Sequence, residues 1–275
     1  MIDLEYTLDY QVHSDRSHDG LCTIHNHCLH AVEIGLDEIG FTEHKDFDPA
    51  DPVVNYFDYD LYSREIEKAR SDFRGSLIIR KGVEIDYQRW FEDSIGKYLE
   101  THSFDFILGS VHHIDRVMVM SPEYLASRDK LQAHRHYFDA VLDSANSGFF
   151  DILGHLEYAN RRGVPHFGAY DSELFTPELR EIFKSMRNQN VVLEINSAGL
   201  RYASGGAYPC LKTVQLYANS GGTCVTFGSD AHEPKYLAAD FIETREIARQ
   251  AGIAHLAQFS NRVRTLLPIT NKKLP

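Results

Sequence analysis

The sequence has little cysteine, no long apolar run and no excess of basic residues. Its four cysteines, Cys22, Cys28, Cys210 and Cys224, form no Cys-x-x-Cys pair, and a chain of 275 residues can bury a core without disulfides. No stretch approaches ~18 apolar residues, so we expect no membrane span. With 28 Lys and Arg against 40 Asp and Glu, the formal charge of −12 argues against binding to nucleic acid or to an anionic membrane.

The start of the chain lacks the pattern of a secretory signal. Its first ten residues, MIDLEYTLDY, carry acidic residues where a signal carries a basic segment followed by an apolar one. Together with the expectation of reduced cysteines, this favours a cytoplasmic location. Neither a linker nor a low-complexity tract divides the sequence, so we expect residues 1–275 to form a single domain.

Short apolar segments alternate with amphipathic ones along the whole chain. We expect strands at 6–13, 37–43, 76–85, 104–111, 150–154, 190–195 and 223–227, and an eighth near 254–259. Helical periodicity is clearest at 57–72, 131–147 and 176–188, and Thr-Pro at 176–177 is typical of a helix start. This alternation predicts a parallel sheet with crossover helices.

Histidine is the residue type in excess, with 15 in the chain, and almost every expected strand ends in a histidine or a carboxylate. The strand-end residues are His13, Glu43, His44, Glu84, Asp86, His112, His113, His155, Glu194, Asn196, Asp230 and His232. Because the carboxyl ends of strands in a parallel barrel meet at one face, we expect these side chains to converge. Imidazole and carboxylate donors suit Zn²⁺, Mn²⁺ and Fe, so the pattern predicts a multinuclear metal site.

The remaining histidines lack such a position. His25, His27 and His30 lie at the start of a helical pattern, where residues two apart point in different directions. The others are expected on the surface, without a role in the site: His102, His134, His136, His166 and His255.

Seven short motifs, taken in order, resemble those of the PHP (polymerase and histidinol phosphatase) superfamily. They are DYQVHSDRSHDG (9–20), FTEH (41–44), GVEIDY (82–87), ILGSVHH (107–113), ILGHLEY (152–158), LEINSAGLR (193–201) and FGSDAH (227–232). GSVH, GHLE and NSAGLR are close to the histidinol-phosphate phosphatase branch. The resemblance covers residues 7–235 and implies an α/β fold, a distorted (β/α)7 TIM-like barrel with its metal site at the strand C-termini.

The resemblance also implies two to three divalent metal ions, which could be Zn, Mn or Fe. By matching position, the implied ligands are Gln11, His13, Glu84 and Asp230 for the first ion, Asp19, His44 and His232 for the second, and Glu84, His112 and His155 for the third. Glu84 would then bridge two ions. Asp19 lies six residues after His13, where the family places a ligand, and His18 is the alternative.

The first motif departs from the family at one position. It reads Gln11-Val12-His13 where the family has His-x-His, although the period of a strand still places residues 11 and 13 on one face. A glutamine amide is a weaker donor than imidazole towards zinc or iron, but its oxygen could ligate a harder ion. Reduced occupancy, a different metal preference and an engineered change that traps a substrate all remain open.

The predicted reaction is hydrolysis of L-histidinol phosphate to L-histidinol and phosphate by a metal-activated hydroxide. Arg201 matches the family's phosphate-binding arginine, and Arg161 or Arg162 could supply a second guanidinium to this small phosphorylated substrate. Asp230 or His232 could serve the leaving alkoxide.

Residues beside the implied ligands could support them. Glu43 and His113 are placed to orient their neighbours. Tyr202, Tyr208 and Glu157 adjoin the motifs and are candidates for the pocket that holds the imidazole of the substrate.

Three alternatives compete with this function. One is a related phosphoesterase that acts on a different small phosphate ester, and another is a metal-binding protein whose activity is reduced or lost through Gln11. The third, an amidohydrolase, is disfavoured because no strand ends in a lysine that could be carbamylated. The oligomeric state is not indicated by the sequence.

Overall fold

A ten-stranded sheet forms the centre of the protein in the computed structural model, which describes residues 6–269. Its strands are β1 (Leu8–Val12), β2 (Glu38–Phe41), β3 (His44–Lys45), β4 (Ile78–Asp86), β5 (Phe106–Ser110), β8 (Ile152–Leu153), β9 (Val192–Asn196), β10 (Cys224–Gly228), β11 (His255–Ser260) and β12 (Val263–Pro268). The strand order is β1-β2-β4-β5-β8-β9-β10-β11-β12, and β3 pairs with β4. Every pairing in this sheet is parallel except that of β11 with β12.

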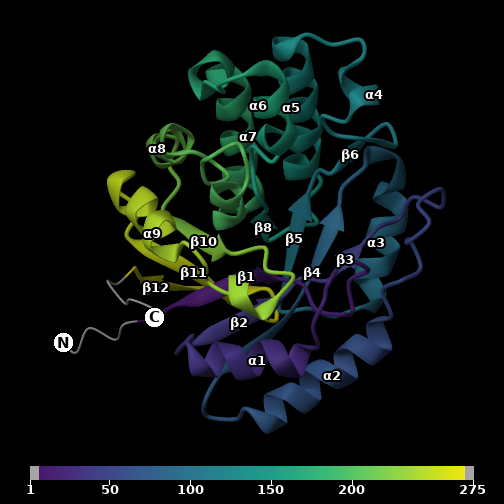
Figure 1. Cartoon of the computed structure of the whole chain (residues 1–275), viewed down its shortest axis with the longest axis vertical. Helices are drawn as coiled ribbons and strands as arrows, with labels where there is room; N and C mark the ends of the chain where they lie inside the picture. The colour runs from purple at the N-terminus through teal and green to yellow at the C-terminus, as the bar shows by residue number, and fades with distance from the viewer. Residues whose placement is uncertain (1–5, 270–275) are drawn as a thin grey trace.

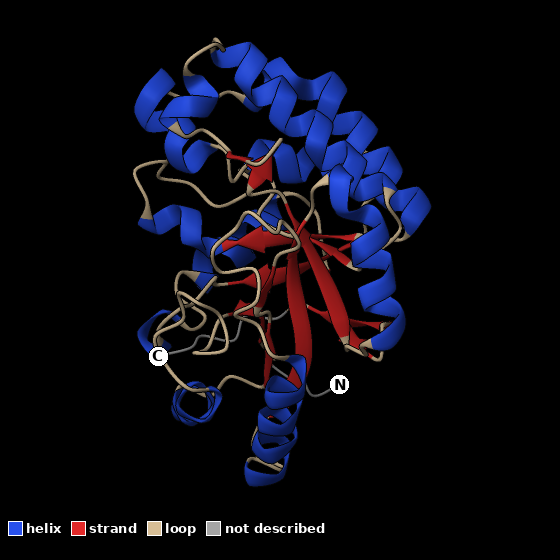
Figure 2. Ribbon diagram, turned by 90° about the vertical axis from the view of Figure 1, so that its right-hand side faces the viewer, coloured by secondary structure: helices blue, strands red, loops and turns tan. Residues whose placement is uncertain are grey.

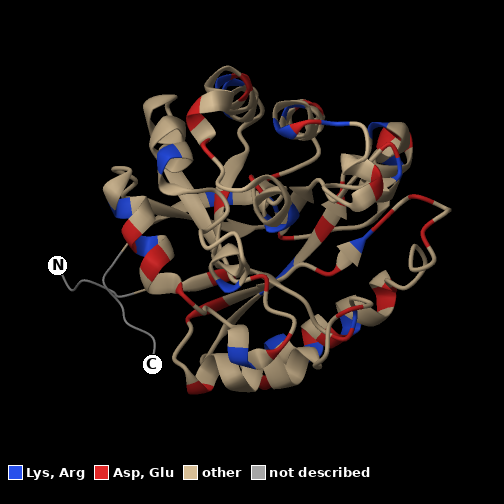
Figure 3. Cartoon of the chain, turned by 45° about the horizontal axis from the view of Figure 1, so that its top comes forward, with Lys and Arg blue, Asp and Glu red and all other residues tan. Residues whose placement is uncertain are grey.

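Helices connect the strands and surround the sheet (Figures 1 and 2). They are α1 (Ile24–Glu33), α2 (Tyr59–Asp72), α3 (Glu92–Thr101), α4 (Pro122–Leu125), α5 (Lys130–Asn146), α6 (Asn160–Phe167), α7 (Thr176–Gln189), α8 (Leu211–Asn219) and α9 (Phe241–Gln250). Short 3₁₀ turns include η1 (Arg89–Phe91) and η3 (Ser197–Arg201), and β6 (His113–Ile114) pairs with β7 (Val117–Met118) in a separate hairpin. Lys and Arg are interspersed with Asp and Glu on the outer helices, so no helix forms a purely basic face (Figure 3).

Local sequence accounts for the ends and inner faces of these helices. Asp129 and Gln132 form a reciprocal capping box at the start of α5, which satisfies two backbone N–H groups there. Helix α7 begins with Thr-Pro and ends at Asn190, which adopts the left-handed conformation. The buried residues of α7 recur every three or four positions, so one face of the helix packs inward: Leu179, Ile182, Phe183 and Met186.

The core is closely packed where β1, β4 and β5 meet. The rings of Tyr10 and Phe106 stack with centroids 4.6 Å apart. A Cβ atom at Gly82 would lie 2.5 Å from the Phe106 ring, so only glycine allows this approach.

Strand β1 also contacts the segment that follows β10. Val12 forms an isolated parallel bridge with Ala231, and the N–H of His13 donates to the Ala231 carbonyl at 2.9 Å. The amino-terminal strand thereby lies beside the last strand of the expected seven, far away in the sequence.

Each expected strand and helix is confirmed, with ends that agree within two residues. Strand β12 and the β6–β7 hairpin were not expected, because they pair antiparallel and break the β-then-α pattern. The four cysteines are free, as expected. None of the helices in residues 6–269 is both long enough and apolar enough to cross a membrane.

One expectation about histidines was wrong. His134 is only 1% exposed and lies on the inner face of α5, where its ring stacks on Phe175 and its Nδ1 contacts the Lys130 carbonyl at 2.8 Å. The prediction failed because it used position relative to strands and ignored the helical face.

Candidate metal centre

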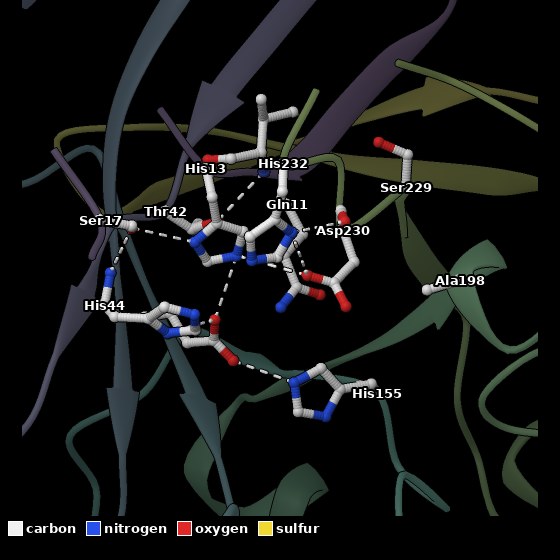
Figure 4. Close-up of polar contacts among 12 residues, drawn as sticks. Gln11, His13, Ser17, Thr42, His44, His155, Ala198, Ser229, Asp230 and His232 are labelled. Atoms are coloured by element: carbon white, nitrogen blue, oxygen red, sulfur yellow. Dashed lines mark hydrogen bonds and ion pairs between the residues drawn. The ribbon is translucent and has the colours of Figure 1, made fainter. Parts of the chain in front are cut away.

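The implied ligands, apart from Gln11, converge at the carboxyl ends of the parallel strands. Figure 4 shows the imidazole of His13 between those of His44 and His232, with ring centroids 4.3 and 4.4 Å away. Two overlapping sets of three side chains each hold donor atoms within 4.8 Å of one another: His13, His44 and His232, and His44, Glu84 and His112. This is the face at which parallel barrels carry their active sites.

Glu84 is the centre of the arrangement. Its fully buried carboxylate comes from β4, with Oε2 3.3 Å from His13 Nε2 and 3.2 Å from His44 Nδ1. Its other oxygen, Oε1, lies 2.9 Å from His155 Nε2 and 3.4 Å from His112 Nε2. One carboxylate therefore faces two groups of imidazoles, one on each of its oxygens.

Asp19 and Asp230 complete the set on the open side. Asp19 Oδ2 lies 3.2 Å from His232 Nε2 and 3.5 Å from His44 Nε2. Asp230 Oδ1 lies 3.4 Å from His13 Nε2. His18 also lines the cavity, but within residues 6–269 it has only ring contacts there, with His44 and Tyr56. The geometry therefore favours Asp19 over His18 as the ligand.

A hydrogen-bond chain from Glu43 orients His13. Ser14 Oγ and Ser17 Oγ each donate to the buried Glu43 carboxylate at 2.6 Å. With its own proton used in this way, Ser17 Oγ accepts from His13 Nδ1 at 3.2 Å and from the His44 backbone N–H at 3.0 Å. His13 Nε2 is then the nitrogen that faces Glu84 and Asp230, and a cation bound there would take the place of its proton.

Similar contacts fix the other imidazoles. Asp86 accepts from His113 Nδ1 at 2.8 Å and from the His112 backbone N–H at 2.7 Å. Glu194 accepts from the His155 backbone N–H at 2.7 Å. Ser17 was missed in the sequence, although its spacing of four residues from His13 in SDRSHDG was a usable signal.

The cluster strongly favours positive charge. Burial lowers the pKa of His13, but the Asp230 and Glu84 carboxylates that face its Nε2 outweigh burial and raise the pKa to about 9. Burial also lowers the pKa of His232, but the Asp19 and Asp230 carboxylates outweigh burial and raise that pKa to about 9. Burial alone would raise the pKa of Glu84, yet the surrounding imidazoles lower it well below its ordinary value. These carboxylates stay ionised and call for cationic partners.

The donor set fits divalent cations. Among the residues described, the buried side-chain atoms without a hydrogen-bond partner include His13 Nε2, Glu84 Oε2 and His155 Nδ1. Burial lowers the pKa of His112 to about 4, so its ring is neutral, and its Nε2 lies 3.2 Å from that of His155. Convergent nitrogen and carboxylate donors of this kind are typical of sites for Zn²⁺, Mn²⁺ or Fe.

Gln11 does not join the cluster. Asn196 Oδ1 accepts from the Ala198 backbone N–H at 2.8 Å, which directs Asn196 Nδ2 towards Gln11 Oε1 at 2.5 Å and Glu194 Oε2 at 3.2 Å. The oxygen through which a glutamine would ligate is thus engaged, and within residues 6–269 the Nε2 of Gln11 is buried without a hydrogen-bond partner. An amide nitrogen is not a useful ligand, so this side chain fits a cation poorly.

Replacing Gln11 by histidine is expected to raise the metal content of the purified protein by one ion per chain. An imidazole at this position would share the face of β1 with His13 and add a nitrogen donor near Asp230 and Glu84. Elemental analysis of wild type and Gln11→His, purified side by side, measures the change. Equal stoichiometry in the two proteins would contradict the expectation.

Two of the three expected arginines border the cluster. All of the candidate ligands except Gln11 and His13 line a cavity of about 360 Å³, together with Tyr158 and Arg161, and an adjoining cavity of about 290 Å³ adds Arg201. Arg201 Nη2 donates to the Ser229 carbonyl, and its guanidinium lies 5.0 Å from the Tyr236 ring centre. The Arg161 guanidinium lies 4.0 Å from the Tyr202 ring centre. Exposed Arg162 lines neither cavity and faces a separate depression beside Pro122 and Leu125.

Two candidates for the imidazole pocket were placed wrongly from the sequence. Glu157 is 1% exposed and accepts from the Cys210 backbone N–H at 2.9 Å and from the Tyr170 hydroxyl at 3.1 Å. Tyr208 is also buried and bonds to Ser204 at 2.7 Å. Both side chains are used inside the fold, whereas Tyr202 borders the cavity that holds Arg201.

A parallel sheet with imidazoles and carboxylates gathered at its carboxyl edge defines an α/β protein with a candidate metal centre. The sequence pattern of the PHP domain matches residues 9–198. The chain therefore belongs to the PHP family, which confirms the resemblance found in the seven motifs. The match ends before Arg201, Asp230 and His232, which the structure nevertheless brings to the same cavity.

Similar proteins cover nearly the whole chain. The histidinol-phosphatase of Lactococcus lactis is 30% identical over 274 residues, covering 92% of this chain and 94% of its own. A probable histidinol-phosphatase of Deinococcus radiodurans is 28% identical, covering 85% and 94%. The crystal structure of the Lactococcus lactis histidinol phosphate phosphatase, complexed with Zn, L-histidinol and phosphate, matches with a TM-score of 0.86 at 28% identity, covering 94% and 98%.

Proposed function

We propose that this protein is a metal-dependent phosphatase that hydrolyses L-histidinol phosphate to L-histidinol and phosphate. The observation that carries the proposal is the placement of Arg161 and Arg201 beside the two groups of metal-ligating side chains, in adjoining cavities that share Asp19 and Asp230. Phosphate esters need guanidinium and cation partners together, and both are present here. The similarity to histidinol-phosphatases over most of the chain supports the choice of substrate.

The residues that would hold the cations are His13, Asp19, His44, Glu84, His112, His155, Asp230 and His232. Divalent cations bound there supply Lewis-acid stabilisation and lower the pKa of a coordinated water. Gln11, the ninth residue of the implied set, accepts a hydrogen bond from Asn196, and we propose that it is not a ligand. We infer two to three ions per chain, drawn from Zn, Mn and Fe.

The chain's own residues bind the phosphate and serve the leaving group. Arg201 is fixed by the Ser229 carbonyl and by the Ser197 hydroxyl at 3.4 Å, so its remaining N–H groups can meet phosphate oxygens without a further loss of side-chain freedom. Arg161, held over Tyr202, provides the second contact. Asp230 and His232 belong to the ligand cluster and also line the cavity that holds Arg161 and Arg201, so they are placed to serve the leaving alkoxide.

We also propose the finer features of the fold. The Val12–Ala231 bridge supports closure of the parallel strands into a distorted (β/α)7 barrel. The absence of a linker in the sequence supports one domain across residues 1–275. An acidic chain with a small polar cavity supports a cytoplasmic enzyme acting on a small molecule and not on nucleic acid or membrane.

Removal of metal is expected to abolish phosphate release from L-histidinol phosphate. Dialysis against a chelator should leave turnover at background, because carboxylates without bound cations repel the phosphate. Added Zn²⁺, Mn²⁺ or Fe²⁺ should restore turnover. Phosphate release is measured with L-histidinol phosphate beside other phosphate monoesters and diesters. Full activity after exhaustive chelation would contradict the metal requirement, and preference for another ester would contradict the substrate.

A further inference from the structure

A second cavity, of about 590 Å³, adjoins the metal centre. It is lined by residues of η1, of the start of the β6–β7 hairpin and of helix α5, and Figure 1 shows α5 beside β6. His113 lines both this cavity and the one that holds the candidate ligands. None of the motifs assigns a role to the rest of its wall.

The wall of this cavity is acidic. Asp115 from the hairpin and Asp139 and Asp143 from α5 all line it. The single Lys or Arg among the lining residues is Arg89, whose side chain is 77% exposed and lies 3.9 Å from Asp143. Three carboxylates against one rim guanidinium leave a negative potential inside.

Two buried atoms of the wall lack hydrogen-bond partners within residues 6–269. Gln88 is 7% exposed, and its Oε1 has none. His136 Nδ1 has none either, while its Nε2 lies 3.8 Å from Asp115. A buried polar atom without a partner costs about 1–3 kcal/mol, so a ligand that donates hydrogen bonds here would be favoured. Because an amide oxygen accepts only, Gln88 calls for an N–H or O–H donor.

An exposed indole stands at the same cavity. Trp90 is 72% exposed, and its Nε1 donates to Asp115 at 3.4 Å. A large aromatic side chain left in solvent beside carboxylates is a suitable partner for a cation, which the face of the ring attracts.

We propose that this cavity binds a small organic cation rich in N–H groups, such as an amine that carries an imidazole ring. Its ammonium or ring N–H groups meet Gln88, Asp139 and Asp143, and Trp90 covers it. The cation is either a free amine or the unphosphorylated end of a substrate that reaches past His113 from the metal centre. Binding is communicated to the centre through Asp86, which contacts both His113 and the His112 backbone.

The binding test uses the single tryptophan of the chain as its reporter. Titration of the metal-loaded protein with L-histidinol should give a saturable change in Trp90 fluorescence, and the anion imidazole-4-acetate should give none. Asp139→Asn and Asp143→Asn should each weaken L-histidinol binding about tenfold, the usual value of a charged hydrogen bond. Glu181→Gln is the matched control. It removes an exposed carboxylate on α7 that lines no part of the cavity, so it should leave binding unchanged.

Steady-state kinetics separate the two sources of the cation. If the substrate's own end occupies the cavity, Asp139→Asn raises KM for L-histidinol phosphate and leaves that for p-nitrophenyl phosphate unchanged. If a free amine occupies it, added L-histidinol alters turnover of p-nitrophenyl phosphate without competing for it, and Asp139→Asn removes the effect. A fluorescence titration that shows no saturation, or that is identical in both Asp variants and wild type, overturns the proposal. The fluorescence result does not require turnover, so it stands apart from the proposed function.

Discussion

Replacing Glu84 by glutamine is expected to lower kcat/KM for L-histidinol phosphate by about 10³-fold or more, because the several kcal/mol supplied by bound cations is lost. The substitution keeps the shape of the side chain and removes its charge. The four imidazoles within 3.4 Å of Glu84 would then surround a neutral amide, and cations on both sides would lose their shared ligand. Metal content should fall together with activity.

Activity and elemental analysis on the same preparation test this expectation. Glu181→Gln, which removes an exposed carboxylate paired with Lys184, serves as the control and should retain full activity and full metal content. A Glu84→Gln protein that keeps its metal and loses less than tenfold in kcat/KM would show that Glu84 is not the shared ligand.

Replacing Arg201 by alanine is expected to reduce kcat/KM about 100-fold, the usual cost of removing one group that stabilises developing charge in the transition state. Lysine at this position should restore only part of the loss, because it keeps the charge and lacks the planar pair of N–H donors. The melting temperature of each variant should be measured as well, since Arg201 also bonds to the Ser229 carbonyl.

Arg162→Ala offers a matched control for this experiment. Arg162 neighbours Arg161 in sequence, but it is exposed and lines neither cavity of the metal centre. Its removal should change kcat/KM less than twofold, within the small range typical of surface substitutions. Equal effects of Arg162→Ala and Arg201→Ala would assign the loss to overall charge instead of to a specific contact.

Much of the fold could be predicted because buried apolar strands alternate with amphipathic helices along the chain. The run at Phe106–Ser110 is apolar and fully buried, as the strands of a parallel sheet are. Strand β12 was missed because its residues are mostly exposed and its partner is the adjacent β11, so neither an apolar run nor a crossover helix marks it.

The candidate site was predictable for residues that follow strands and not for those whose role depends on neighbours. His13, His44 and His155 needed only the convergence of strand ends. Gln11 has the right position on β1, but Asn196 holds its amide away from ligation, and that contact spans 185 residues. The acidic cavity beside Trp90 was unpredictable for the same reason, since its wall combines segments that carry no common motif.

The bridge between Val12 and Ala231 has a consequence for how the protein is made. Asp19 and His232, which face each other in the cluster, are separated by 213 residues, so Asp19 emerges from the ribosome long before His232. At typical synthesis rates this interval is roughly 10–40 s, during which the early strands have no partner at their open edge. We expect the nascent chain to capture metal only after β10 has emerged, and folding to be limited by this late, long-range closure.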